Sequence, residues 1–419
     1  MPILITLRDG LKAGKYDAKL ANLYGDLTAA KRRVQRLIEL YADYFNDEGT
    51  EVSLFSAPGR TEIGGNHTDH NNGRVLAGAI ELDTLGLAGK CEGDIIKLQS
   101  VGFAKNTVNI ETLSPDEGGS TSDRIIRGVC AGFAKNGLPY GGFHAVTHSD
   151  VPPGSGLSSS AAFENLIGVI IDHLYGDGRI KPSTLARIGN FAENVYIQKP
   201  SGLMDQTASA VGGLSLMDFA DPEKPQVESI PFDCPGHTMI ITGPIGCHAD
   251  LTPEYAAIPQ EMRKVAWTLG QDTMRGVTNE RFIAALPSMT TTISGRALLR
   301  AFHFLRENER AYKQAKALKS GDFEHFLQLV NESGLSSFMY LQNVVLQEEQ
   351  GLGVALMLSE MLLNGRGAHR VHGGGFAGTI QAFVPDDILE SYKTGMEAVF
   401  GIGSCLAVRI RKQGVVKVI

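Results

Sequence analysis

One short segment, residues 57–70, carries many polar side chains among turn-forming residues. Its sequence is APGRTEIGGNHTDH. Arg60 could neutralise a phosphoryl group in transfer or lower the pKa of a nearby carboxylate, and Asp69 could accept hydrogen bonds from two sugar hydroxyls. His67 and His70 are spaced like strand or turn neighbours, but without a third ligand nearby the pattern disfavours a metal site.

A second segment, VPPGSGLSSS, has the order of an anion-binding loop. Glycines follow a predicted strand, and Ser158, Ser159 and Ser160 open a predicted helix, whose free N–H groups and dipole favour a negative ligand. The lysine of the common P-loop NTPase motif is missing, which disfavours that class. A serine-capped helix after a tight loop explains the pattern equally well.

Two further features bear on phosphoryl transfer, which needs held phosphates, a divalent ion and a group that orients or deprotonates the attacking hydroxyl. Asp205 follows the turn at Gly202, where it could point into a cleft or cap the next helix. Glu193 lies in a predicted helix. The string RVHGGGFAGTIQAFV, at 370–384, is either a bulge or a backbone that approaches a ligand closely.

The periodicity of apolar residues predicts the elements that position these groups. We expect helices over 28–46, 122–136 and 158–175, and strands over 51–57, 142–148 and 238–242. The 51–57 strand should end in a turn at Pro58–Gly59. Residues 75–112 should be rich in strands and 297–363 mainly helical. The proline-rich stretch 222–235 marks a seam, so we expect one domain over 1–220 and another over 221–419.

Composition limits the classes of partner. The chain has 419 residues, a net charge of −7, 43% hydrophobic and 20% charged residues, which is typical of a globular protein and shows no basic surface for nucleic acid or membranes. No apolar stretch is long enough to span a membrane. The five cysteines (Cys91, Cys130, Cys234, Cys247, Cys405) are scattered, which fits a reducing cytoplasm.

Taken together and in this order, these segments resemble the GHMP small-molecule kinases, and galactokinases in particular. APGRTEIGGNHTDHNNG is similar to the galactokinase signature, VPPGSGLSSSAA to the phosphate loop of the family, and RVHGGGFAGT to its glycine-rich third motif. The string AEN…PSGLMDQ and the helical stretch beginning LRENERAYKQ add further similarity. The resemblance extends over about residues 50–390.

The resemblance implies an α+β fold with two lobes, a ribosomal-S5-like N-terminal domain and a ferredoxin-like C-terminal domain, with the active site in the cleft between them. It implies transfer of phosphate from ATP to the anomeric hydroxyl of galactose, with Mg²⁺, by a monomer or weak homo-oligomer. Asp205 would orient or deprotonate that hydroxyl, Arg60 would steady charge beside it, and Ser160 and Glu193 would hold Mg²⁺.

The resemblance also implies the binding residues. The sugar would contact Glu62, Asn66, His67, Asp69, His70, Gly202 and, by a looser match, Tyr255. The nucleotide phosphates would lie against the phosphate loop, formed by Pro153, Gly154, Ser155, Gly156, Leu157, Ser158, Ser159, Ser160 and Ala161. The third motif would contribute Gly373, Gly374 and Gly375.

The chain departs from the usual signature at three positions. Asn66 replaces a glutamate that accepts from the 6-hydroxyl of galactose, His70 replaces a tyrosine and Glu62 replaces an asparagine. A neutral Asn66 suggests a sugar altered at C6, with galacturonate the leading variant, and arabinose or N-acetylgalactosamine as further candidates. A sugar and ATP sensor without activity is another alternative, although the intact phosphate loop disfavours it. The HTD string disfavours mevalonate- or homoserine-type kinases.

Overall fold

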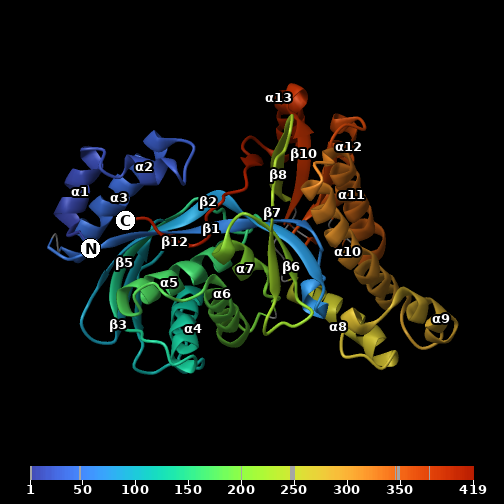
Figure 1. Cartoon of the computed structure of the whole chain (residues 1–419), viewed down its shortest axis with the longest axis horizontal. Coiled ribbons are helices and arrows are strands. Elements are labelled where there is room, and N and C mark those ends of the chain that lie inside the picture. The colour runs from blue at the N-terminus through green and yellow to red at the C-terminus, as the bar shows by residue number, and fades with distance from the viewer. Residues whose placement is uncertain are drawn as a thin grey trace.

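The computed structural model describes residues 2–46, 49–199, 201–245, 251–344, 346, 350–376 and 378–419. Cys247 lies outside these residues. Two sheets organise the described chain, and most of the helices pack against their faces (Figure 1). No helix within the described ranges is long and apolar enough to cross a membrane.

The first sheet is built mainly from the N-terminal half of the chain. Its central strands run in the order β12-β1-β2-β5-β3-β4, and β6 and β7 extend it beside β2. The bounds are β1 Ser53–Gly64, β2 Arg74–Lys90, β3 Ile95–Ser100, β4 Asn106–Asn109, β5 Phe143–Ser149, β6 Leu214–Asp218, β7 Gln226–Ile230 and β12 Val416–Lys417.

Helices cover both faces of this sheet, so its central strands are buried on both sides. The helices are α1 Leu4–Lys12, α2 Asp17–Ala21, α3 Leu27–Phe45, α4 Thr121–Lys135, α5 Ser159–Tyr175, α6 Pro182–Phe191 and α7 Met204–Val211. Phe55 packs into the core with α4 and α5, whereas its neighbour Leu54 packs into the core with α1 and α3. Neighbouring side chains of a strand point to opposite faces, which explains why every residue of β1 is buried.

The second sheet has the ferredoxin-like arrangement that the resemblance implied. Strands β8 His237–Ile245, β9 Ala368–His372, β10 Gly378–Pro385 and β11 Cys405–Val408 lie in the antiparallel order β11-β8-β10-β9. Helices α10 Gly295–Lys319 and α11 Phe323–Ser336 share one core with this sheet, and α12 Gly351–Leu363 and α13 Leu389–Phe400 share another. The remaining helices α8 Thr252–Thr268 and α9 Asn279–Met289 pack beside α10.

The chain crosses between the two sheets more than once. β7 lies within the proline-rich stretch 222–235 but pairs with β6, and β12, near the C-terminus, pairs with β1. Residues beyond 220 therefore help to complete the first sheet, and a division of the chain at that position stays a prediction.

The expected helices and strands are present, but the prediction of a turn at Pro58–Gly59 is wrong. β1 continues through these residues to Gly64, and its register against β2 shifts between Pro58 and Arg60. Such a bulge accommodates a proline and redirects the strand. A Cβ atom on Gly59 would lie 2.7 Å from the carbonyl oxygen of Leu157, so glycine lets the phosphate loop pack directly on β1.

Candidate active site

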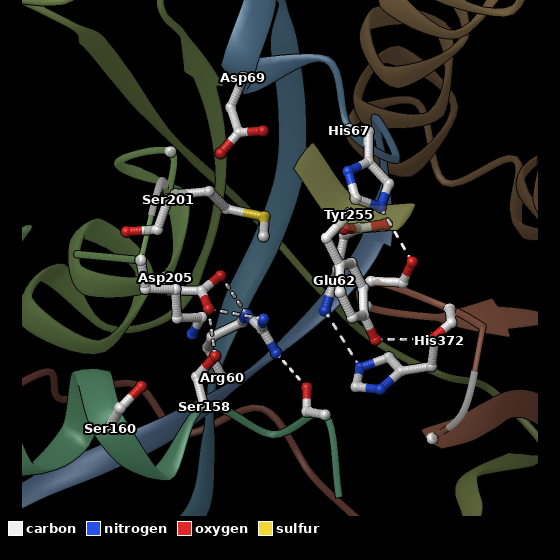
Figure 2. Close-up of a pocket in the computed structure, with 18 of the residues that line it drawn as sticks. Arg60, Glu62, His67, Asp69, Ser158, Ser160, Ser201, Asp205, Tyr255 and His372 are labelled. Atoms are coloured by element: carbon white, nitrogen blue, oxygen red, sulfur yellow. Dashed lines mark hydrogen bonds and ion pairs between the residues drawn. The ribbon is translucent and has the colours of Figure 1, made fainter. Parts of the chain in front are cut away.

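A cavity of about 510 Å³ collects residues from both sheets and their loops (Figure 2). Most of the residues singled out in the sequence line it: Arg60, Glu62, His67, Asp69, His70, Gly154, Gly156, Ser158, Ser159, Ser160, Gly202, Asp205, Tyr255, Gly373, Gly374 and Gly375. The polar signature segment, the phosphate loop and the third glycine-rich string therefore meet at one site.

An arginine–aspartate pair lies in this cavity. Arg60 donates from Nε to Asp205 Oδ1 at 2.7 Å and from Nη2 to Asp205 Oδ2 at 2.8 Å. Its third nitrogen donates to the carbonyl oxygen of Gly156, so all three nitrogens of the guanidinium group donate hydrogen bonds. Asp205 is the second residue of α7 and does not cap that helix, which begins after Leu203.

The charge on Asp205 is stabilised by its neighbours. Burial opposes ionisation, but the Arg60 guanidinium and the Ser158 hydroxyl together hold the pKa of Asp205 below its usual value. The carboxylate therefore stays ionised at neutral pH. Its side chain is 26% exposed, so it can accept a hydrogen bond from a hydroxyl that enters the cavity.

The phosphate loop is shaped by residues in the left-handed region. Gly154 and Gly156 have φ values of +74° and +68°, and Ser158 has a φ of +57°. The Ser158 side chain makes no cap on α5 and donates to Asp205 instead. No side chain therefore caps the first N–H groups of α5, so these groups can donate hydrogen bonds to an anion in the cavity.

Glu193 lies behind the loop, at 3% exposure. Ser160 Oγ is 3.4 Å from Glu193 Oε1, the same oxygen that the Lys199 ammonium group contacts at 2.7 Å. Ser201 and Gln206 donate to the second oxygen, Oε2, at 2.6 and 2.9 Å. A hydroxyl and a carboxylate are oxygen donors of the kind that Mg²⁺ binds, and Lys199 shows that a positive charge is accommodated there.

The loop of the signature segment forms the other wall. His67 Nε2 lies 3.0 Å from the carbonyl oxygen of Gly374, and burial lowers the pKa of His67 to about 3. The ring is therefore neutral, so Nε2 donates and Nδ1 is left as an acceptor. Asp69 packs against Gly202, where any Cβ atom would lie 1.8 Å from Asp69 Oδ2.

Tyr255 reaches the cavity from α8. Its hydroxyl donates to the carbonyl oxygen of Gly375 at 2.8 Å, and a Cβ atom on Gly374 would lie 2.5 Å from its ring. In the third glycine-rich string, the backbone therefore lies directly against Tyr255 and His67, which explains why these positions are glycines.

Comparison with known proteins agrees with this geometry. The family model "GHMP kinases N terminal domain" matches residues 124–213, and "Galactokinase galactose-binding signature" matches residues 39–90. The galactokinase of Streptococcus suis is 29% identical over 369 residues, which cover 86% of this chain and 91% of the relative. The galactokinase of Limosilactobacillus reuteri is 28% identical over 377 residues, which cover 87% and 94%.

The chain belongs to the GHMP kinase family and is of the galactokinase type. Its fold matches Lactococcus lactis galactokinase complexed with galactose, with a TM-score of 0.80 and 25% identity over 90% of this chain and 98% of that one. A mevalonate kinase matches with a TM-score of 0.61 at 14% identity, which reflects the shared fold alone.

One predicted sugar contact of this GHMP kinase is corrected by the structure. Asn66 is fully buried and does not line the cavity. Its amide nitrogen donates to Glu62 and to Gly373, and its oxygen accepts from Ser337 and Asn343. Because both ends of the amide are occupied inside the protein, Asn66 gives no support to galacturonate as the substrate.

The charges of the cavity also disfavour an acidic sugar. Glu62, Asp69 and Asp205 all line it, while its Arg60 and Lys199 are each paired with a carboxylate. A uronate would therefore meet negative charge without a free arginine or lysine among the lining residues.

Four phosphate-loop residues and Glu193 also lie outside the cavity lining. Leu157 and Ala161 are fully buried and anchor the loop, and the Ser155 hydroxyl donates within the loop to Pro152 at 2.6 Å. Pro153 is exposed at the outer side. These side chains shape the loop, so only its backbone and the remaining serines face the cavity.

His372 is the main lining residue that sequence reasoning missed. Its Nε2 lies 3.0 Å from the Thr61 hydroxyl and its Nδ1 lies 3.0 Å from the Thr379 hydroxyl. Burial, with Arg60 and Arg370 nearby, lowers its pKa well below the ordinary value, so it is neutral. Its position directly before the three glycines was the available signal. Lys199, Ser201, Met204, Leu251 and Ala256 also line the cavity without a distinct sequence signal.

Proposed function

We propose that the protein transfers the γ-phosphoryl group of ATP to the anomeric hydroxyl of galactose, giving galactose 1-phosphate and ADP. The observation that carries the proposal is the Arg60–Asp205 pair, which lies between the phosphate loop and the signature loop in one cavity. An acceptor for the hydroxyl, a site for phosphates and a site for a sugar are thus adjacent.

Asp205 accepts a hydrogen bond from the anomeric hydroxyl and so aims the sugar oxygen at the phosphorus atom. Because its pKa is lowered, Asp205 is a weak base in the resting enzyme, and it takes the proton as the oxygen–phosphorus bond forms and the hydroxyl becomes acidic. Arg60 holds the carboxylate in place and stabilises negative charge that develops beside it.

The nucleotide phosphates lie against the loop Pro152–Ser160 and the first turn of α5. Ser160 and Glu193 would hold Mg²⁺, which supplies positive charge for the phosphate oxygens. Lys199 lies beside Glu193 with a side chain that is 59% exposed, so it can move aside for the metal ion without leaving a buried position.

We infer two further properties of the protein. It acts in the cytoplasm, which is supported by the free thiols of the four described cysteines Cys91, Cys130, Cys234 and Cys405. It acts as a monomer or weak homo-oligomer, as the resemblance to galactokinases implies.

The test is an ADP-release assay with Mg-ATP and a panel of galactose, N-acetylgalactosamine, glucose, arabinose and galacturonate, with Asp205→Ala as the control. We expect turnover with galactose that is lost in the variant. Turnover with another sugar alone would overturn the assignment of galactose and keep the mechanism. Binding of sugar and ATP without turnover would indicate a sensor instead.

A further inference from the structure

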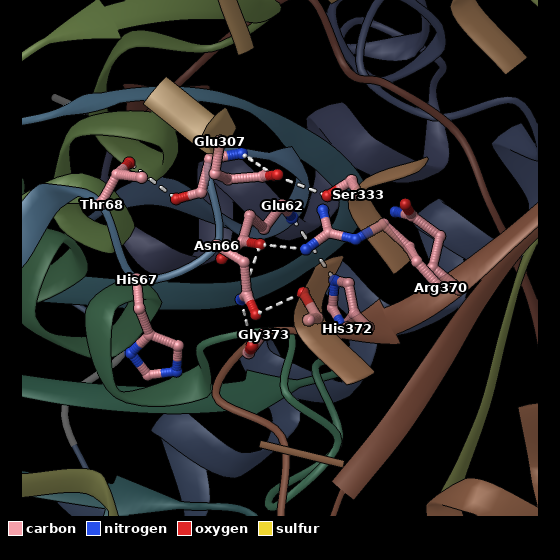
Figure 3. A network of polar contacts seen from close by, with 12 residues as sticks. Glu62, Asn66, His67, Thr68, Glu307, Ser333, Arg370, His372 and Gly373 are labelled. Carbon is pink, nitrogen blue, oxygen red and sulfur yellow. Dashed lines mark hydrogen bonds and ion pairs between the residues drawn. The ribbon is translucent and has the colours of Figure 1, made fainter. Parts of the chain in front are cut away.

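In the buried polar network behind the loop of the signature segment, Asn66 and Glu62 have different roles (Figure 3). Asn66 has no exposure, and its amide is fully used by protein partners. Glu62, four residues earlier on β1, is also largely buried, but its side chain keeps 3% exposure and lines the cavity. Of the two side chains, the one that can reach a ligand is therefore the carboxylate at position 62.

One oxygen of Glu62 is held firmly. Arg370, which has no exposure, donates to Glu62 Oε1 at 2.6 Å, and Asn66 Nδ2 donates to the same oxygen at 3.0 Å. The other oxygen, Oε2, has no hydrogen-bond partner among the described residues, and it is not completely buried. An ionised carboxylate accepts at both oxygens, so Oε2 is available to a ligand in the cavity.

The same contact favours the charged form of Glu62. Burial raises the pKa of Glu62 above its ordinary value, and the Arg370 guanidinium offsets part of that rise. A buried guanidinium stays protonated and needs a counter-charge, and Glu62 is the carboxylate with which Arg370 forms an ion pair among the described residues.

We propose that Glu62 determines sugar specificity in this enzyme: its Oε2 accepts a hydrogen bond from one hydroxyl of a neutral sugar, while Arg370 and Asn66 hold its other oxygen in place. The inference rests on the proposed sugar kinase function and adds the selecting contact. The substrate class is a neutral sugar whose hydroxyl donates at that point, and a sugar that lacks this hydroxyl is rejected.

The experiment compares galactose with its 2-, 3-, 4- and 6-deoxy analogues in the wild-type enzyme and in Glu62→Gln. In the variant, the amide oxygen must face Arg370 and Asn66, since both are donors there, and the amide NH₂ group then faces the cavity. We expect one analogue to lose at least tenfold in kcat/KM with the wild type. That loss should shrink to less than threefold in Glu62→Gln, mainly through KM for the sugar.

A second variant keeps the test valid if Glu62→Gln folds poorly, since the substitution leaves Arg370 without its counter-charge. Glu62→Gln/Arg370→Met removes both charges, and thermal unfolding reports whether each variant is folded. The double variant should show the same flattened response to the deoxy sugars. Glu360→Gln, an exposed glutamate on α12, is the matched control and should keep the wild-type response.

The outcomes separate the two proposals. If every deoxy penalty is the same in the wild type and in the folded Glu62 variants, the role of Glu62 is overturned while the kinase function stands. If the wild type phosphorylates no sugar of the panel, the proposed function itself fails.

Discussion

A methyl group added at Gly202 should weaken sugar binding and leave ATP binding intact. In Gly202→Ala the new Cβ atom would lie 1.8 Å from Asp69 Oδ2, where ordinary contact begins at 3.4 Å, so Asp69 must retreat by about 1.6 Å, the difference of the two distances. The backbone itself tolerates alanine, because Gly202 is not among the residues with positive φ. The strain therefore falls on the Asp69 carboxylate.

The size of the effect follows from what Asp69 contributes. A displacement of 1.6 Å exceeds the tolerance of a hydrogen bond, and each bond to a charged group is worth about 1.5 to 3 kcal/mol. Loss of one such bond corresponds to a roughly 10- to 150-fold rise in KM for galactose, at about 1.36 kcal/mol per factor of ten. Because the phosphate loop is not touched, KM for ATP should change less than threefold.

The assay is steady-state kinetics with galactose varied at saturating ATP, and the reverse. Gly353→Ala on α12 is the matched control, because no atom outside its own helix lies within 4 Å of a Cβ atom there. Asp69→Asn and the double variant complete the test, since two changes that act through one contact are not additive. An unchanged KM for galactose in Gly202→Ala, or equal losses for both substrates, would refute the reasoning.

The remaining predictions concern catalysis, metal, the loop and stability. Asp205→Asn should lower kcat by roughly 10²- to 10⁴-fold, the usual share of an acid–base group, while calorimetry still detects ATP binding; a loss under tenfold would remove Asp205 from the mechanism. Glu193→Gln should raise the Mg²⁺ concentration needed for half-maximal activity about tenfold or more, by analogy with altered metal ligation, and an unchanged requirement in a Mg²⁺ titration would contradict its assignment. Gly156→Ala, at a φ of +68°, should cost about 1 kcal/mol of loop stability and raise KM for ATP; unaltered ATP kinetics would show that the loop geometry is not needed. The Arg310 guanidinium, acting against burial, holds the pKa of the fully buried Glu307 at about 2, below its ordinary value of 4.5. Glu307 therefore contributes about 3 kcal/mol of stability above pH 4.5, which is lost as the pH falls towards 2. Chemical denaturation of Glu307→Gln should show lower stability at pH 7 and a weaker dependence on pH over that interval, and a dependence equal to that of the wild type would count against it.

Local sequence was enough to predict the elements that carry the site. Helical and strand periodicity placed α3, α4, α5 and β5 within one or two residues of their observed bounds, because these patterns arise from the spacing of side chains along a single element. The phosphate loop was predictable for the same reason, since its glycines and the first turn of α5 are continuous in the chain. The resemblance to GHMP kinases then gave the order in which the segments combine.

Packing between distant segments decided what the individual side chains do. Arg60 and Asp205 are 145 residues apart in the chain, and Glu62 and Arg370 are 308 apart, so no local pattern predicts that they touch. Asn66 occupies a signature position yet turns into a buried network, because its partners come from β1, the η4 segment Ser337–Leu341, the residue Asn343 just after it and the third glycine-rich string. The sequence determined which chemical groups are available, and only the tertiary structure decided that the carboxylate at 62, rather than the amide at 66, lines the cavity.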